Sequence, residues 1–188
     1  MSTVSIIAEA GVNHNGSYQI AEKLVEKAAN AGADIVKFQT FKAEHLATKT
    51  APKAQYQVNR TGSSESQYMM LKKLELDEES HLKIKDRCDL KGIQFLSTPF
   101  DISSLHFLIQ KLDIPKLKIS SGEITNAPLL LEAAKTGKPL IISTGMCTME
   151  EVQVALGVLA FGYTKPEQKP DPEYFQTAFD SVEGRKCL

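Results

Sequence analysis

Polar residues that could bind an anion or transfer a proton stand at the ends of short apolar runs. The first run contains Glu9, the second contains Lys37 and Gln39, and the third ends in Thr98. The fourth and fifth runs continue this pattern with Lys118, Ser121, Glu123 and Ser143. A lysine inside an apolar run is costly unless an anion pairs with it, and hydroxyl groups beside glycines suit phosphate or carboxylate oxygens. We therefore predict an anion-binding site, with the two glutamates available for proton transfer.

The apolar runs themselves predict the strands that position these side chains. They cover residues 5–10, 34–40, 94–100, 116–121 and 140–146. They are short and mostly continuous, which is typical of parallel strands covered on both faces. In such folds ligands bind at the edge where the strands end, and all five runs end in polar residues.

Helical patterns separate the predicted strands. They cover residues 17–31, 65–74, 77–91, 103–112 and 128–136, and a capping box at Thr148–Glu151 opens another. Alternating strands and helices predict a parallel α/β fold with the strands side by side in the order one to five. Residues 41–66 form a long polar insertion after the second strand, and such loops are often functional.

Composition excludes several classes of protein. The 188 residues carry 22 basic and 23 acidic side chains, a net charge of −1, which does not favour nucleic-acid or membrane-surface binding. No run approaches the ~20 apolar residues of a membrane span, and the N-terminus does not look like a secretory signal. Three scattered cysteines indicate neither a disulfide framework nor a metal knuckle, so we expect a cytoplasmic protein.

Structural interpretations of the same residues remain open. Lys37 could form an ion pair with Glu9 or Glu123 that serves stability alone. The Ser121-Gly122 and Thr144-Gly145 pairs could be turn residues. For the histidines we expect turn, surface or packing roles rather than metal ligation: His14, His45, His81 and His106.

Five motifs in a fixed order give a family resemblance. IIAEAGVNHNGS, ADIVKFQT, FLSTPFD, KISSGE and ISTGM resemble the N-terminal part of the sialic acid synthase (N-acetylneuraminate synthase) family. The resemblance implies a TIM-barrel transferase that condenses phosphoenolpyruvate with N-acetylmannosamine or a related amino sugar, giving a nonulosonic acid and phosphate. It also implies a homodimer and a divalent metal, typically Mn²⁺, that activates the sugar aldehyde.

The resemblance also assigns roles to the polar residues. Lys37 matches a lysine that contacts phosphoenolpyruvate, and Gln39 matches a residue near the metal and the sugar. The residues that match other positions around phosphoenolpyruvate are Thr98, Lys118, Ser121 and Ser143. Glu9 and Glu123 match acidic residues that handle the sugar and the intermediate. The implied catalytic residues are Glu9, Lys37 and Glu123.

The chain departs from the family pattern after the fifth strand. We expect an incomplete (β/α)8 barrel, with five of eight strands in residues 1–162, because a full barrel takes ~250 residues. Residues 163–188 would form a Pro-rich segment and a short helix over about 173–182. The family's metal-binding histidines match none of the histidines in this chain, so no metal ligand is assigned. We expect the isolated chain to be aggregation-prone and inactive.

Other functions fit parts of the pattern. The chain could be an inactive remnant or an anion-binding module. It could serve a synthase for a related sugar such as legionaminic or pseudaminic acid. A different phosphoenolpyruvate-dependent synthase or phosphate-binding barrel is a further alternative, but the NHNG and SSGE motifs argue against it.

Overall fold

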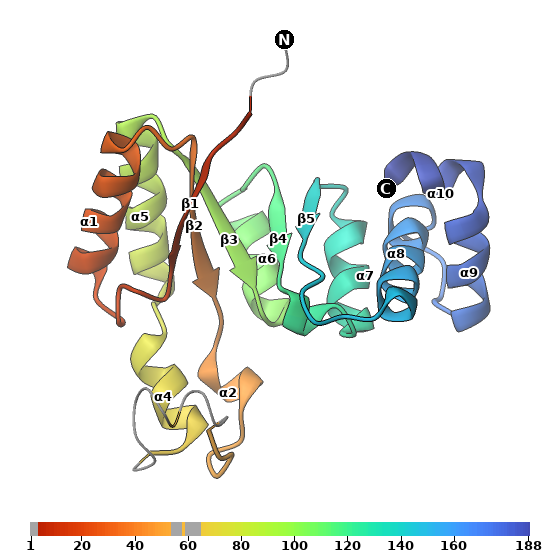
Figure 1. The fold of residues 1–188 in the computed structure, drawn as a ribbon, viewed down its shortest axis with the longest axis horizontal. Helices are drawn as coiled ribbons and strands as arrows, with labels where there is room; N and C mark the ends of the chain where they lie inside the picture. The colour runs from red at the N-terminus through yellow and green to blue at the C-terminus, as the bar shows by residue number, and fades with distance from the viewer. Residues whose placement is uncertain (1–3, 54–57, 59–64) are drawn as a thin grey trace. The chain divides into compact units, whose positions relative to one another are not determined.

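The computed structural model describes residues 4–53, 58 and 65–188, and its fold is α/β (Figure 1). Two compact units follow each other along the chain, residues 1–97 and residues 98–188. The sequence-based division into residues 1–162 and 163–188 differs from these two units and stays a prediction.

The first unit is built on a sheet with the strand order β1-β2-β3. The strands are β1 (Ile7–Gly11), β2 (Ile35–Thr40) and β3 (Gln94–Pro99), the last of which runs into the second unit. β1 and β2 pair in parallel, and Glu9 is the register partner of Lys37. Most residues of β2 and β3 are buried, as expected for covered parallel strands.

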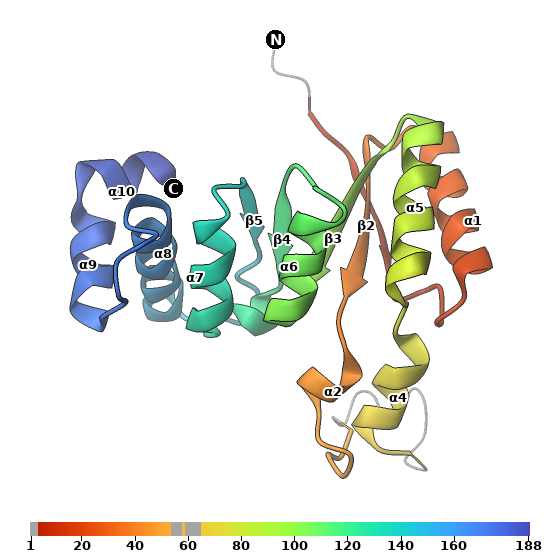
Figure 2. The same cartoon turned by 180° about the vertical axis from the view of Figure 1, so that it is seen from behind.

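Two helices lie side by side next to this sheet (Figures 1 and 2). They are α1 (Tyr18–Asn30) and α5 (Glu78–Lys91). Ser17 caps α1 by accepting from the Ile20 N–H, and Asp77 caps α5 by accepting from the Ser80 N–H. Both helices agree with the predicted patterns.

Shorter helices follow β2. They are α2 (Ala43–Leu46) and α4 (Gln67–Leu74), and both lie beyond the end of β2 (Figure 1). The predicted insertion 41–66 therefore begins with a helical turn. Residues 54–57 and 59–64 of it lie outside the described residues.

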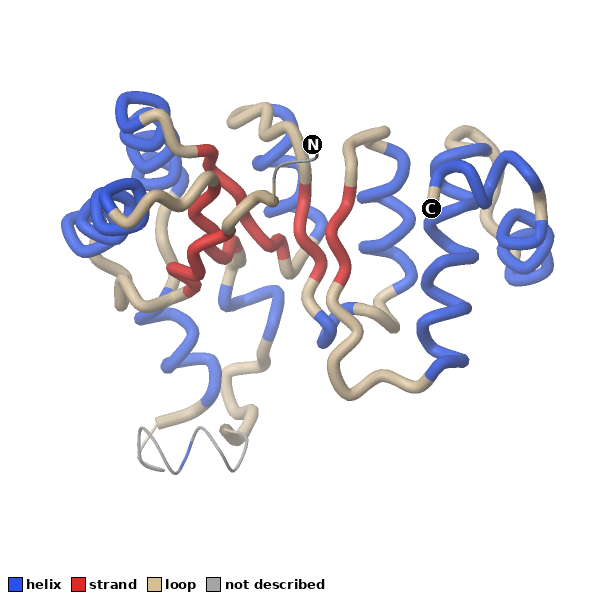
Figure 3. Tube along the Cα trace, turned by 45° about the horizontal axis from the view of Figure 1, so that its top comes forward, coloured by secondary structure: helices blue, strands red, loops and turns tan. Residues whose placement is uncertain are grey.

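The second unit contains a parallel pair of strands with helices beside it (Figure 3). The strands are β4 (Leu117–Ile119) and β5 (Leu140–Ile142). The helices are α6 (Ile102–Gln110), α7 (Ala127–Lys135), α8 (Met149–Thr164), α9 (Pro172–Asp180) and α10 (Val182–Cys187). The capping box of Thr148 and Glu151 opens α8 as predicted, and the helix expected near residues 173–182 is α9.

Glycines allow the helices of the second unit to pack closely. A Cβ atom on Gly162 would lie 2.6 Å from the Cβ of Ala134 on α7, and one on Gly157 would lie 2.9 Å from the Phe175 carbonyl oxygen on α9. Larger residues at either position would push the helices apart. The segment after residue 162 is thus packed onto α8 rather than extended.

All five predicted strands are present, but they fall into two sheets instead of one. Strand order agrees with the prediction within each sheet, and the five-stranded partial barrel is not confirmed. β5 ends at Ile142, four residues earlier than predicted. The chain turns there, because Met146 has a positive φ of 64° and the Cys147 N–H donates to the Thr144 carbonyl. β4 also ends early, because a 3-10 turn begins at Ser121.

Among the described residues, no helix has the length and apolar character needed to cross a membrane. Cys88, Cys147 and Cys187 are all free thiols.

Candidate active site

The pairing of β1 with β2 brings Glu9 and Lys37 together. The Lys37 ammonium lies 2.5 Å from a Glu9 carboxylate oxygen. The Lys37 side chain is only 13% exposed, whereas that of Glu9 is 55% exposed. The structure therefore contains the ion pair that was one of the two interpretations of Lys37. Because Glu9 stays largely hydrated, an incoming anion can replace it at the lysine without burying an unpaired carboxylate.

Gln39 joins this pair at the end of β1. Gly11 has a positive φ of 54°, and a Cβ atom added there would lie 3.0 Å from Glu9 Oε1 and 3.9 Å from Gln39 Nε2. The two side chains thus converge on the bare backbone of Gly11. Glu9, Lys37 and Gln39, predicted as site residues, form one cluster in the first unit.

A second cluster forms where β4 and β5 end. The Lys118 ammonium donates to Ser143 Oγ at 2.5 Å and to the Ile119 carbonyl at 2.6 Å. Lys118 is half-buried in β4, and Ser143 is the first residue after β5. The structure therefore brings these two predicted residues into direct contact.

Ser121 and Glu123 lie in the 3-10 turn that follows β4. Glu123 accepts a hydrogen bond of 2.7 Å from the Asn126 side chain, which caps α7. Ser121 lies near the loop after β5, since a Cβ atom on Gly145 would be 3.8 Å from Ser121 Oγ. The turn therefore ties a predicted proton-transfer group to the start of a helix.

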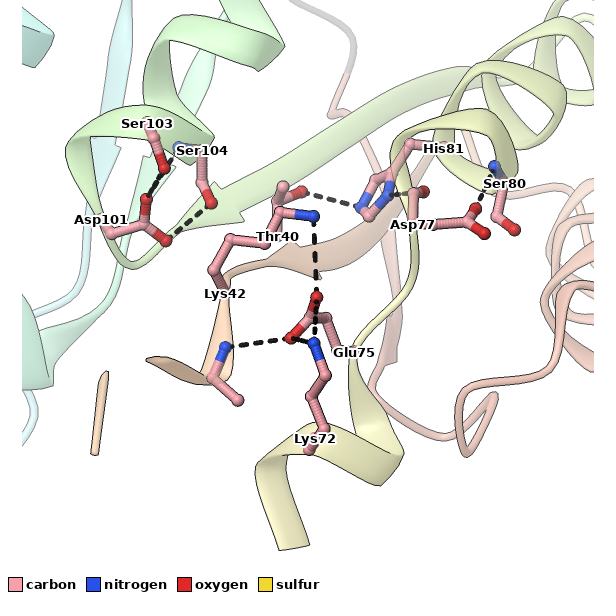
Figure 4. Close-up of polar contacts among 11 residues, drawn as sticks. Thr40, Lys42, Lys72, Glu75, Asp77, Ser80, His81, Asp101, Ser103 and Ser104 are labelled. Atoms are coloured by element: carbon pink, nitrogen blue, oxygen red, sulfur yellow. Dashed lines mark hydrogen bonds and ion pairs between the residues drawn. The ribbon is translucent and has the colours of Figure 1, made fainter. Parts of the chain in front are cut away.

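Thr98 stands at the end of β3 and is 2% exposed. The residue before it, Ser97, belongs to a buried polar chain that sequence reasoning did not find. Thr40 Oγ1 lies 2.7 Å from Ser97 Oγ. It also lies 3.0 Å from His81 Nε2 (Figure 4). His81 is spaced at helical intervals from the buried Ile84 and Cys88, which places it on the inner face of α5. This spacing is a sequence signal that could have identified it.

A carboxylate fixes the chain just after β2. Glu75 accepts from the Ala43 N–H at 3.0 Å and forms ion pairs with Lys72 and Lys42 (Figure 4). Burial alone would raise the pKa of Glu75, but the Ala43 hydrogen bond and the two lysines outweigh it and lower the pKa. Glu75 is therefore ionised at neutral pH and stabilises the start of α2.

The residues described do not fit a metal site. No three His, Cys, Asp or Glu side chains among them lie close enough to hold a metal ion. His14 is buried and its Nε2 has no hydrogen-bond partner, but its Nδ1 accepts from the Gly16 N–H in the turn after β1. Its role in that turn agrees with the prediction.

The parallel strands, the helices and the polar residues of the strands define an α/β protein with a candidate anion site. A sequence model of the NeuB family matches residues 24–173, so the chain belongs to the NeuB family.

Relatives and solved structures agree with this assignment. The chain is 55% identical over 154 residues to N,N'-diacetyllegionaminic acid synthase of Legionella pneumophila, which covers 82% of this chain and 43% of the relative. It is 49% identical to the Campylobacter jejuni protein of the same name, over 85% of this chain and 47% of the relative. The chain therefore spans less than half the length of these curated relatives.

A solved structure also shares the fold. N-acetylneuraminic acid (sialic acid) synthetase from Leptospira borgpetersenii, in complex with citrate, superimposes with a TM-score of 0.71 at 31% identity. The match covers 86% of this chain and 51% of that one. The family resemblance stated from the five motifs is confirmed.

Proposed function

We propose that this chain supplies the N-terminal part of the active site of a nonulosonic acid synthase. The reaction would join phosphoenolpyruvate to an N-acetylated amino sugar with a new C–C bond and release phosphate. The observation that carries this proposal is the presence of two lysines inside parallel strands, the largely buried Lys37 of β2 and the half-buried Lys118 of β4, in a chain of the NeuB family. Lysines in such positions stabilise phosphate and carboxylate groups through charge-assisted hydrogen bonds.

In this proposal the lysines and hydroxyl groups bind phosphoenolpyruvate. Lys37 exchanges its Glu9 partner for an anionic group of the substrate. Lys118 holds a second group together with Ser143, and its 2.5 Å contact with that hydroxyl already orients the ammonium. Thr98 and Ser121 add further donors.

Glu9, Glu123 and Gln39 act on the sugar. Carboxylates beside phosphoenolpyruvate would repel it, so their place is next to the neutral amino sugar and the groups that exchange protons. A divalent metal, Mn²⁺, remains part of the proposal for the complete enzyme. None of the roles proposed for this chain's residues passes through it.

The names of the relatives favour one sugar class as a second candidate. Both the Legionella and the Campylobacter proteins are named N,N'-diacetyllegionaminic acid synthase, and the two are 55% and 49% identical to this chain. A diacetylated amino sugar is therefore an alternative to N-acetylmannosamine as the acceptor.

The test uses a fusion enzyme and the chain alone. In the fusion enzyme, this chain replaces the segment that it matches in the Legionella synthase. Phosphate release and product are measured with phosphoenolpyruvate, Mn²⁺ and each sugar in turn. We expect the fusion enzyme to make one nonulosonic acid and the chain alone to make none. A folded fusion enzyme without product would instead favour an inactive remnant or an anion-binding module.

A further inference from the structure

The ends of β2 and β3 are joined by a buried chain of hydrogen bonds on the side opposite the predicted site residues. Its members are Thr40, Ser97 and His81, and their exposed fractions are 5%, 0% and 1%. Successive side chains of a strand point to opposite faces of the sheet. Thr40 therefore lies opposite to Gln39, and Ser97 opposite to Thr98.

The chain of hydrogen bonds has a single direction. His81 Nδ1 lies 2.9 Å from the Asp77 carbonyl, which can only accept, so Nδ1 carries the proton. In the neutral ring Nε2 is then an acceptor and takes the Thr40 hydroxyl proton at 3.0 Å. The Thr40 oxygen in turn accepts from Ser97 Oγ at 2.7 Å. Burial lowers the pKa of His81 and favours the neutral ring, although the backbone carbonyls of Asp77 and Gln39 act in the opposite direction.

Packing alone does not account for polar residues at these positions. Phe38 and Phe95, each two residues before Thr40 and Ser97 and on the same face of the sheet, stack with their ring centroids 5.8 Å apart. Apolar residues at positions 40 and 97 would continue that contact without burying polar groups, which is costly unless every group is bonded. What the polar chain adds is a fixed relative position of the two strand ends.

We infer that His81 is a positioning residue: through Thr40 and Ser97 it fixes the strand ends that present Gln39 and Thr98 to the substrates. This inference rests on the proposed function, which places those two residues at the site. His81 touches no substrate and acts through the two hydroxyl groups. Loss of either hydroxyl would let β2 and β3 shift, and small displacements of binding groups reduce affinity strongly.

The experiment measures phosphoenolpyruvate binding to the fusion enzyme by calorimetry, at a temperature where each variant is folded. Thr40→Val keeps the shape of the side chain and removes the hydroxyl. We expect it to weaken binding about tenfold, a loss typical of removing a supporting hydrogen bond. Thr40→Ser restores the hydroxyl and should recover wild-type affinity.

Two controls separate positioning from stability and from the proposed function. Phe95→Leu on the same face should lower the unfolding midpoint without changing affinity. Lys37→Met should weaken binding as well. If Lys37→Met weakens binding but Thr40→Val does not, the inference is wrong and the function stands. The inference also fails if Thr40→Ser binds as poorly as Thr40→Val. If the folded fusion enzyme does not bind phosphoenolpyruvate, or its Lys37→Met variant binds as well as wild type, both the proposed function and the inference are overturned.

Discussion

Lys37 is the residue on which substrate binding is expected to depend most. Its ammonium is largely buried and its partner, Glu9, is largely hydrated, so the lysine can exchange one anion for another. Charge-assisted hydrogen bonds to such a group contribute roughly 1.5–3 kcal/mol each. Lys37→Met should therefore weaken phosphoenolpyruvate binding about tenfold or more, measured by calorimetry. Lys23→Met, at an exposed position of α1, removes the same charge and should leave the affinity unchanged.

Glu123 offers a test of the division between anion binding and sugar chemistry. Glu123→Gln removes the charge but still offers an oxygen to the Asn126 side chain, so the cap of α7 is kept. In the fusion enzyme we expect kcat to fall roughly 100-fold or more, as for the loss of a proton-transfer group. The KM for phosphoenolpyruvate should stay within about threefold. A reversed result, with normal turnover and lost binding, would assign Glu123 to the anion site instead. Glu150→Gln, in the exposed first turn of α8, is the matched control.

At the scale of elements, Gly11 links the end of β1 to the site. A Cβ atom there would be strained by the positive φ and would crowd Glu9 Oε1. Gly32 also has a positive φ, of 81°, but has nothing within 4 Å of its Cβ position. We expect Gly11→Ala and Gly32→Ala each to cost about 1 kcal/mol of unfolding free energy, measured in urea. Only Gly11→Ala should also slow the fusion enzyme. Equal turnover in the two variants would mean that Gly11 has no part in placing Glu9.

The elements that sequence predicted well are those fixed by local chemistry. Apolar runs marked every strand, and the Thr148–Glu151 capping box marked the start of α8. The end of β5 was placed too late, because Met146 adopts a left-handed conformation that its residue type does not signal. Polar strand ends pointed to Lys118 and Ser143, and the structure brings these two into contact.

The buried hydrogen bonds of His81 were not predicted, because a histidine on a helix is equally compatible with the surface, the core or a functional site. The role of His81 depends on the contact between Thr40 of β2 and Ser97 of β3. These two hydroxyl residues are 57 positions apart in the sequence. The division of the strands into two sheets was equally hidden from sequence. Strand periodicity gives the order of neighbours but not where their pairing stops.

At the scale of the whole chain, buried histidines make stability depend on pH. Burial and, to a smaller extent, the nearby His81 lower the pKa of His14 to about 4. A hydrogen bond to the Gly11 carbonyl acts in the opposite direction but is outweighed. Because the unfolded chain binds this proton near pH 6.5, the unfolded state gains protons first as the pH falls. Stability is then full above about pH 6.5 and declines between pH 6.5 and 4.

We therefore expect the unfolding free energy to be lower at pH 5 than at pH 7.5 by about 1–2 kcal/mol, measured by urea denaturation. The pKa of Glu26, Glu65, Glu75 and Asp77 is also lowered, and the stability from these groups is lost only at still lower pH. His14→Asn should weaken the dependence, whereas His106→Asn, at an exposed site, should not. An unchanged slope in His14→Asn would show that His14 does not contribute.

The central claim is that this chain's lysines and glutamates complete the active site of a nonulosonic acid synthase. The most direct measurement is phosphate release together with product by the fusion enzyme, with phosphoenolpyruvate, Mn²⁺ and an N-acetylated amino sugar. We predict one product per phosphate released, and loss of both in Lys37→Met. A fusion enzyme that folds like the Legionella synthase but releases no phosphate with N-acetylmannosamine or with the diacetylated sugar would contradict the claim.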